Sequence, residues 1–262
     1  MEFDKQIAGR AKLSKILKEH VLKPTSVYEI ESYRKLPKSV IDIAPDCCFI
    51  VSEGKLIDMK KCRSCESLVT VSTIKNIIKN HTESNFLIMK DASSGMAKPR
   101  LMDLKLGTRT YSDRLPKEKI EARIAKCNGN TTSQHGLRMC GARFTNKKNG
   151  EVVTWTKAQG KLLNREEFVD YMKVFFNVSQ LQKDLLVSQL EKIKTVLENL
   201  SWHRFFGSSL LVLIDDEEEL KVKIKLIDFA SMARSEENEP QYPGVDTGAI
   251  FGVTNLIRIL NE

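Results

Sequence analysis

The sequence contains no long apolar run. No stretch approaches the roughly 18 consecutive apolar residues that a membrane-spanning helix requires, and the opening residues, MEFDK, are charged where a secretory signal would be apolar. We therefore expect neither a transmembrane segment nor a secretory leader. These features favour a protein of the cytoplasm, the nucleus or both.

Cysteine is also scarce, and one pair alone has a spacing typical of metal sites. Cys62 and Cys65 form a Cys-x-x-Cys motif like that of zinc knuckles. A structural zinc site needs four ligands, however, and no second paired motif follows. In an intracellular protein we expect reduced thiols, without a zinc site. The six cysteines are Cys47, Cys48, Cys62, Cys65, Cys127 and Cys140.

The sequence lacks the interleaved basic and aromatic residues of RNA-binding modules, so nucleic acid is not an expected partner. Positive charge nevertheless prevails, with a net charge of +8 at pH 7. Such an excess favours a polyanionic partner, and charge alone does not choose among a phosphorylated small molecule, nucleic acid and an anionic membrane. The length of 262 residues and the hydrophobic content of 41% suffice for one large domain or two packed lobes.

One short segment, residues 99–107 (PRLMDLKLG), combines the apolar pattern of a strand with charged residues. Pro99 marks its beginning and Gly107 its end. Asp103 and Lys105 are two residues apart, so in a strand both side chains leave the same face. Most such pairs simply lie on a solvent-exposed edge of a sheet and have no functional role. As a site, the same pair binds an anionic substrate and steers the group beside it.

The pattern Pro-x-x-x-Asp-x-Lys-x-Gly in this segment resembles the signature of the inositol polyphosphate kinases. Residues 107–109 (GTR) and 136–141 (GLRMCG) resemble the inositol hexakisphosphate kinase branch of that family. Residues 227–230 (IDFA) are similar to the family's counterpart of the metal-binding Asp-Phe-Gly of protein kinases. The resemblance extends over about residues 21–37 and nearly all of 85–262.

The resemblance implies an α+β, two-lobed, kinase-like fold. Residues 1–90 are expected to form an N-lobe built on an antiparallel sheet, and residues 91–98 a hinge. Residues 99–262 are expected to form a larger α+β C-lobe. Within it, a small helical segment at about residues 108–140 is expected to bind the inositol phosphate.

On the nucleotide side, the resemblance implies ATP and Mg²⁺ as cofactors. Lys23 resembles the strand lysine that binds nucleotide phosphates, and Glu29 its ion-pair partner on a helix. Asp91 is the candidate contact for the ribose hydroxyls. Asp228 is expected to bind the metal, and Ser209 to support the metal site. Without the resemblance, Lys23 and Glu29 would read as exposed charges and Asp91 as an ordinary turn residue.

On the acceptor side, the resemblance implies a cluster of contacts to the inositol phosphate. The catalytic residues are expected to be Asp103, Lys105 and Asp228. Asp103 acts as a general base if the acceptor is a hydroxyl, and orients the acceptor or the metal if it is a phosphate, which is already anionic. The predicted acceptor contacts are Asp103, Lys105, Arg109, Lys157 and Lys161.

Three functions are consistent with these residues. The leading one is ATP-dependent transfer of a phosphate to inositol hexakisphosphate, which forms a diphosphoinositol polyphosphate. Its alternative within the family is phosphorylation of a ring hydroxyl of a lower inositol phosphate such as the trisphosphate. A non-catalytic inositol polyphosphate-binding module is the third. The expected partners are the inositol phosphate and ATP, and the chain is expected to be a monomer.

The N-terminal segment departs from the kinase pattern. Gly9 is the one glycine in residues 1–18, so no glycine-rich loop over the nucleotide is visible. The acceptor segment has clearer expectations. A basic amphipathic helix is predicted at about residues 116–127, where it would wall the ligand pocket, and the polar residues 128–134 are predicted to form a flexible lip. His135 is expected to be a loop residue and not a catalyst.

Overall fold

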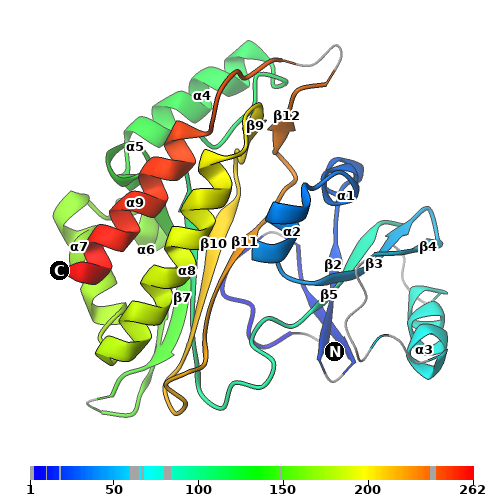
Figure 1. Cartoon of the computed structure of the whole chain (residues 1–262), viewed down its shortest axis with the longest axis horizontal. Coiled ribbons are helices and arrows are strands. Elements are labelled where there is room, and N and C mark those ends of the chain that lie inside the picture. Colours follow the sequence, from blue (N-terminus) through cyan, green and yellow to red (C-terminus); the bar gives the residue numbers. More distant parts are fainter. Residues whose placement is uncertain are drawn as a thin grey trace.

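Two antiparallel sheets, each of five strands, carry the fold (Figure 1). Helices accompany both sheets, so the architecture is α+β, as the sequence predicts. The computed structural model describes residues 3–9, 11–17, 19–59, 65, 68–79, 84–147, 149–236 and 240–262. Among these residues, no helix combines the length and the apolarity needed to cross a lipid bilayer.

The first sheet has the strand order β1-β2-β5-β3-β4. Its strands are β1 (Ser14–Leu17), β2 (His20–Pro24), β3 (Cys47–Ser52), β4 (Lys55–Asp58) and β5 (Phe86–Lys90). Two of them, β3 and β5, are apolar almost throughout because both faces of the sheet are covered. The main core lies on one face, and a second apolar cluster that includes Ile74 lies on the other. The helices of this half are α1 (Val27–Arg34), α2 (Lys38–Ile43) and α3 (Leu68–Lys79).

The second sheet has the order β11-β10-β6-β7-β8, which places the predicted signature strand at its centre. Its strands are β6 (Pro99–Leu106), β7 (Leu137–Thr145), β8 (Val152–Trp155), β10 (Ser209–Asp215) and β11 (Val222–Ile227). On β6, Met102, Leu104 and Leu106 belong to the main core. Asp103 and Lys105 lie on the other face and line a pocket. The alternation expected for this strand is therefore confirmed.

A layer of helices covers the core face of the second sheet (Figure 1). The largest member, α8, begins at a capping box formed by Ser179 and Gln182 and buries leucine and isoleucine side chains at helical spacing. Because this layer occupies one face of the sheet, the opposite face is left for the pocket. The helices of the layer are α6 (Lys157–Leu162), α7 (Arg165–Phe175), α8 (Gln180–Glu198) and α9 (Thr247–Asn261).

Two helices lie between β6 and β7 in the chain, at one end of the second sheet. The predicted basic helix is present as α4 (Lys117–Asn128). The expectation of a flexible lip at residues 128–134 is wrong, because α5 (Thr131–His135) occupies most of this segment. The Asn130 side chain caps α5 by accepting a hydrogen bond from the backbone N–H of Thr132 at 2.9 Å.

The connection between the sheets is short. The first sheet ends at Lys90 and β6 begins at Pro99. The two halves also touch directly, because α2 of the first half contacts β11 and α8 of the second. A small ladder of β9 (His203–Arg204) and β12 (Ala233–Arg234) completes the strands that the structure describes. The division into lobes at residues 90 and 99 stays a prediction from the sequence.

Candidate active site

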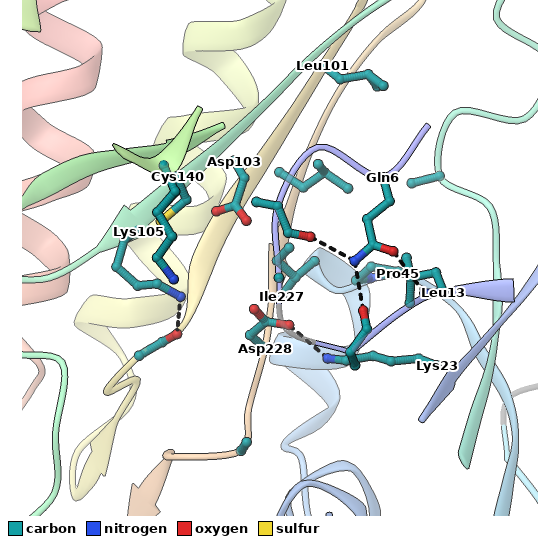
Figure 2. Close-up of a pocket in the computed structure, with 18 of the residues that line it drawn as sticks. Gln6, Leu13, Lys23, Pro45, Leu101, Asp103, Lys105, Cys140, Ile227 and Asp228 are labelled. Carbon is teal, nitrogen blue, oxygen red and sulfur yellow. Dashed lines mark hydrogen bonds and ion pairs between the residues drawn. The ribbon is translucent and has the colours of Figure 1, made fainter. Parts of the chain in front are cut away.

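A pocket of about 430 Å³ lies between the two sheets and takes residues from both. Figure 2 shows Lys23 and Asp228 pointing toward each other, with Asp103 and Lys105 projecting from β6 beside them. Three predicted site residues, Arg109, Lys161 and Ser209, are not among the lining residues. The predicted residues that do line the pocket are Lys23, Glu29, Asp91, Asp103, Lys105, Lys157 and Asp228.

Lys23 lies between two carboxylates. Its Nζ is 2.7 Å from Glu29 Oε1 and 2.8 Å from Asp228 Oδ1. Burial alone would lower the pKa of Lys23, but the charges and hydrogen bonds of Asp228 and Glu29 raise it above its ordinary value. Burial likewise opposes ionisation of Asp228, yet Lys23 and then Lys105 hold the pKa of that carboxyl below its ordinary value. Within this triad of Lys23, Glu29 and Asp228, the lysine and Asp228 are therefore charged at neutral pH.

Local structure fixes the carboxylates of the triad. Ser26 caps α1 and accepts a hydrogen bond from the backbone N–H of Glu29, which sets that residue in the first helical turn. The Glu29 carboxylate accepts a hydrogen bond from the backbone N–H of Phe229 at 3.2 Å. Asp228 has a φ of 66°, and the Ser208 hydroxyl donates to its carbonyl at 2.8 Å. A left-handed aspartate costs about 1–3 kcal/mol, so the surrounding contacts must hold it in place.

Asp103 and Lys105 form the centre of the pocket. Lys105 Nζ donates a hydrogen bond to the carbonyl of Gly207 at 2.6 Å. Asp103 Oδ1 is buried and accepts no hydrogen bond from the protein. Burial raises the pKa of Asp103, Lys105 opposes that rise, and the negative charge of Asp228 adds to it. A buried carboxylate without a partner is costly, which indicates an atom poised for a ligand.

A cluster of positive side chains surrounds the far end of the pocket; we call it the cationic cluster. Its members are Arg123, Lys126, Arg138, Lys157 and Lys161. The pKa of Lys126 is lowered by burial and then by the charges of Lys161, Arg138, Arg123 and Lys157, so these cations lie close enough to repel one another. Nε and Nη1 of Arg138 are buried without a hydrogen-bond acceptor. An anionic ligand in the pocket would relieve both costs.

The sequence missed Arg138, although it lies within a segment that resembles the family. It is paired with Lys105 across the strands β6 and β7, and Ser209 of β10 lies opposite Lys105 on the other side. This register, which places Arg138 beside Lys105, is set by sheet pairing and not by local spacing. Arg123 and Lys126 were expected on a basic helix that walls the pocket, and both are lining residues.

Residues of the N-terminal segment also line the pocket, where the sequence showed no glycine-rich loop. Gln6 organises this segment: its Nε2 donates to the carbonyls of Ala8 and Ala11, and its Oε1 accepts from the N–H of Leu13 at 2.8 Å. In Figure 2, Gln6 and Leu13 lie across the pocket from Lys105 and Cys140. The Gln6 side chain thus stabilises a turn beside Lys23, and no sequence motif predicted this turn.

Arg109 lies outside the pocket lining and is engaged elsewhere. Its Nε donates to the carbonyl of Tyr111 at 2.8 Å, and its guanidinium forms an ion pair with Asp113. The same guanidinium lies over the rings of Tyr111 and Phe206, 4.4 and 4.6 Å from their centroids. Its predicted contact with the substrate stays a prediction that this arrangement does not support. His135, expected to be a loop residue, instead ends α5; its ring stacks on that of Phe168, and it is not among the lining residues.

Asp91 lines the pocket next to β5, as expected for a hinge residue. Its Oδ1 accepts hydrogen bonds from the backbone N–H of Ser93 at 2.8 Å and from the Ser93 hydroxyl at 2.7 Å. That hydroxyl in turn accepts a hydrogen bond from Lys5 at 3.1 Å. The carboxylate is therefore held rigidly at the pocket wall. Whether it contacts a ribose stays a prediction.

The acidic residues of the pocket suit a divalent metal ion. Asp228 is ionised, and its side chain is 34% exposed, so its carboxylate is accessible to a ligand. Asp103 contributes a buried oxygen without a protein partner. Hard cations such as Mg²⁺ and Mn²⁺ take oxygen ligands of this kind. The hydroxyl of Ser209 is buried beside Asp103, but this residue is not part of the lining, and its metal role stays a prediction.

Solved structures of known proteins share this fold. A structure of the inositol phosphate multikinase Ipk2 of S. cerevisiae, in complex with ADP and Mn²⁺, superimposes with a TM-score of 0.69 at 18% identity, covering 93% of this chain and 98% of the yeast chain. A second inositol phosphate multikinase structure gives a TM-score of 0.58 at 22% identity, over 67% of this chain and 84% of the other.

Curated relatives agree with these structures. Inositol hexakisphosphate kinase 3 of Homo sapiens is 32% identical over 208 residues, covering 68% of this chain and 51% of the human protein. Inositol hexakisphosphate kinase 2 of Oryctolagus cuniculus is 28% identical over 229 residues, covering 72% of this chain and 54% of the rabbit protein. The chain thus spans about half the length of the curated relatives it matches. A family model described as inositol polyphosphate kinase matches residues 86–261, and the chain belongs to that family.

Proposed function

We propose that the protein is an ATP- and Mg²⁺-dependent kinase that transfers the γ-phosphate to inositol hexakisphosphate and forms a diphosphoinositol polyphosphate. One observation carries the proposal: a single pocket is lined by the triad, by Asp103 and Lys105, and by four members of the cationic cluster, Arg123, Lys126, Arg138 and Lys157. The hexakisphosphate kinase relatives and the ADP–Mn²⁺ complex of the yeast multikinase support the same assignment.

At the nucleotide end, Lys23 binds the phosphates of ATP and Glu29 orients it. Asp228 would hold the Mg²⁺ ion, and Asp91 would contact the ribose. The metal, when bound, neutralises the charge that develops on the transferred phosphoryl group. Phosphoryl transfer otherwise depends on how the protein positions the reacting groups, and the triad supplies a fixed arrangement because Lys23 donates hydrogen bonds to both Glu29 and Asp228.

At the acceptor end, the cationic cluster binds the phosphates of the inositol ring. Arg138 contributes the strongest contact, because its guanidinium is already desolvated and lacks an acceptor. Lys105 lies on the same face of β6 as Asp103, two residues away, and points into the same pocket. There it contacts the phosphate that receives the new group. Several cations around one ligand match the many charges of the hexakisphosphate.

The environment of Asp103 supports a second candidate function, the phosphorylation of a ring hydroxyl. A general base needs a pKa nearer to neutrality than that of an ordinary aspartate, and burial raises the pKa of Asp103 in that direction. This property favours a kinase that phosphorylates a ring hydroxyl of a lower inositol phosphate, where a proton must be removed. With a phosphate acceptor, Asp103 instead orients the acceptor. The two reactions are distinguished by their products.

The test is transfer of label from γ-labelled ATP with Mg²⁺, with inositol hexakisphosphate and inositol trisphosphate offered in parallel and products separated by charge. Label on a species more anionic than the hexakisphosphate supports the proposal, and label only on the trisphosphate supports the second candidate. No transfer to either overturns the kinase assignment. Asp228→Asn should abolish transfer, whereas Glu219→Gln, an exposed acidic residue of the turn before β11, should leave it unchanged.

The remaining features of this proposal come from the sequence alone. We propose a monomeric enzyme of the cytoplasm or nucleus. Gel filtration with light scattering tests the first point, because a monomer elutes with the mass of one chain.

A further inference from the structure

Three metal-binding side chains meet away from the active-site pocket. His20, Cys48 and Cys65 are all fully or almost fully buried. His20 Nε2 lies 3.0 Å from Cys65 Sγ and 3.7 Å from Cys48 Sγ. The three potential ligand atoms all lie within 4.8 Å of one another. None of these residues lines the pocket between the sheets, so the group is separate from the phosphoryl-transfer site.

The three residues come from separate parts of the N-terminal half. His20 begins β2, Cys48 lies on β3, and Cys65 precedes α3. A register shift in the pairing of β3 with β5 falls between Cys47 and Phe49. As a result Cys47 belongs to the main core, while Cys48 belongs to the second apolar cluster together with Cys65. The fold thus selects one of two adjacent cysteines for this group.

The distances match the coordination sphere of zinc. Zinc binds sulfur at about 2.3 Å and imidazole nitrogen at about 2.0–2.1 Å in a tetrahedral arrangement. These bond lengths require a separation of about 3.6 Å between sulfur and nitrogen ligands and about 3.8 Å between two sulfurs. The observed nitrogen–sulfur distances of 3.0 and 3.7 Å lie on either side of the required value. Small side-chain shifts therefore suffice to bind the ion.

We propose that His20, Cys48 and Cys65 bind a zinc ion that ties β2, β3 and the segment before α3 together. Mixed thiolate and imidazole ligands select zinc over magnesium or calcium, which prefer oxygen. Zinc binding requires a neutral imidazole and deprotonated thiols. The sequence alone does not predict this site, because only one of its ligands belongs to the Cys-x-x-Cys motif.

A tetrahedral ion takes a fourth donor in addition to these three. Cys62, the other cysteine of the Cys-x-x-Cys motif, lies outside the described residues. The site as proposed consists of the three described ligands. A protein donor in the fourth position marks a structural site, whereas an open position marks a catalytic one.

The ion strengthens a small core. The second apolar cluster is confined to a few residues on one face of the first sheet, and small cores depend on additional cross-links such as metal ions. β2 also carries Lys23, three residues after His20, so zinc binding fixes the strand that delivers the triad lysine. The members of the cluster are Leu22, Cys48, Phe49, Val51, Cys65, Ile74, Phe86 and Ile88.

The first experiment measures metal content. The full chain, purified with a histidine-free tag and without added metal, is analysed by inductively coupled plasma mass spectrometry. We expect about one zinc ion per chain, and a loss of at least about tenfold in Cys48→Ala and in Cys65→Ala. Cys47→Ala is the matched control, since Cys47 is adjacent, buried and on the other face of β3, and it should retain zinc. Equal zinc in Cys47→Ala and Cys48→Ala overturns the proposal.

A second measurement uses the wild-type protein, so it does not depend on how the variants fold. Zinc is replaced by Co²⁺, which absorbs visible light strongly in tetrahedral sites and shows thiolate charge-transfer bands in the near ultraviolet. Both features are expected here. Their absence, in protein that binds neither zinc nor Co²⁺, overturns the proposal. The proposal is also overturned if the denatured protein has two fewer alkylatable thiols than its six cysteines and the missing pair maps to Cys48 and Cys65, because these two would then form a disulfide.

Discussion

Replacing Lys23 by methionine removes the cation that holds Glu29 and Asp228 together. Removing one partner of a buried ion pair costs about 3–5 kcal/mol when the other stays buried and uncompensated. Here the cost is reduced, because Glu29 keeps its hydrogen bond from the backbone N–H of Phe229, and the Asp228 side chain is 34% exposed to water. We therefore expect Lys23→Met to lower the free energy of unfolding by about 2–3 kcal/mol at neutral pH.

The pH dependence of this cost follows from the directions of the pKa shifts. The pKa of Lys23 is raised, so its contribution is full below its ordinary value of 10.5 and fades only as the pH rises through the raised pKa. The pKa of Asp228 is lowered, so its contribution is present above its ordinary value of 3.8 and is lost as the pH falls through the lowered pKa. The cost of Lys23→Met should therefore be flat around neutrality and shrink on acidification, when the Asp228 carboxylate that has lost its cation becomes protonated.

Urea denaturation of the wild type and Lys23→Met at neutral and acidic pH measures this cost. Lys55→Met, an exposed position on β4 of the same sheet, is the control and should stay within about 0.5 kcal/mol of the wild type. In activity assays, losing a hydrogen bond to a charged phosphate, worth about 1.5–3 kcal/mol, should lower kcat/KM for ATP by roughly 10- to 150-fold. A variant as stable as the wild type, or a cost that grows in acid, refutes the triad as described.

Further predictions concern the acceptor end. Asp103→Asn should lower kcat on a hydroxyl acceptor at least about 100-fold, because the general base is lost. It should also remove the acidic limb of the pH–rate profile, which lies above the ordinary pKa of an aspartate because the pKa of Asp103 is raised. An acidic limb that is unchanged in Asp103→Asn contradicts the general-base role. Lys126→Ala should raise KM for the inositol phosphate but not for ATP, whereas Lys119→Ala, exposed on the same helix, should raise neither. Gly160→Ala should destabilise the protein although alanine favours helices, because its Cβ would lie 2.2 Å from a backbone carbonyl of β7; Gly129→Ala, with 3.5 Å of room, should be tolerated. Thermal unfolding compares the two glycine variants.

Local motifs explain what the sequence predicted well. Asp103 and Lys105 share a strand whose alternation is set by the apolar residues between them, so their common face follows from the sequence. Lys23 and Glu29 lie six residues apart across a capped helix start, and Asp228 directly follows β11, a strand of regular alternation. Each of these residues sits in a segment whose local conformation its neighbours determine.

The features that the sequence missed arise from contacts between distant segments. Arg138 reaches the pocket because β7 pairs with β6 in one particular register. His20, Cys48 and Cys65 meet only after two strands and a helix have packed. Arg109 was assigned to the substrate through its motif, but nearby aromatic rings and an aspartate bind its guanidinium in the folded chain. Register and competition between partners are properties of the fold and not of local spacing.

Helix α5 was missed for a different reason. Its residues, TTSQH, have little helical propensity and no apolar stripe. The cap at Asn130 and the left-handed Gly136, with φ of 63°, define its ends, and packing of His135 on Phe168 holds it. Tertiary contacts of this kind override weak local preferences.

The most direct test of the proposed function is ³¹P nuclear magnetic resonance of the product made from inositol hexakisphosphate with ATP and Mg²⁺. Transfer onto an existing phosphate forms a P–O–P bond, so we expect a pair of coupled diphosphate resonances that appear together with ADP and are absent with Asp228→Asn. An unchanged hexakisphosphate spectrum, with ATP either intact or converted only to ADP and inorganic phosphate, would contradict the assignment of the cationic cluster as the site of a phosphate acceptor.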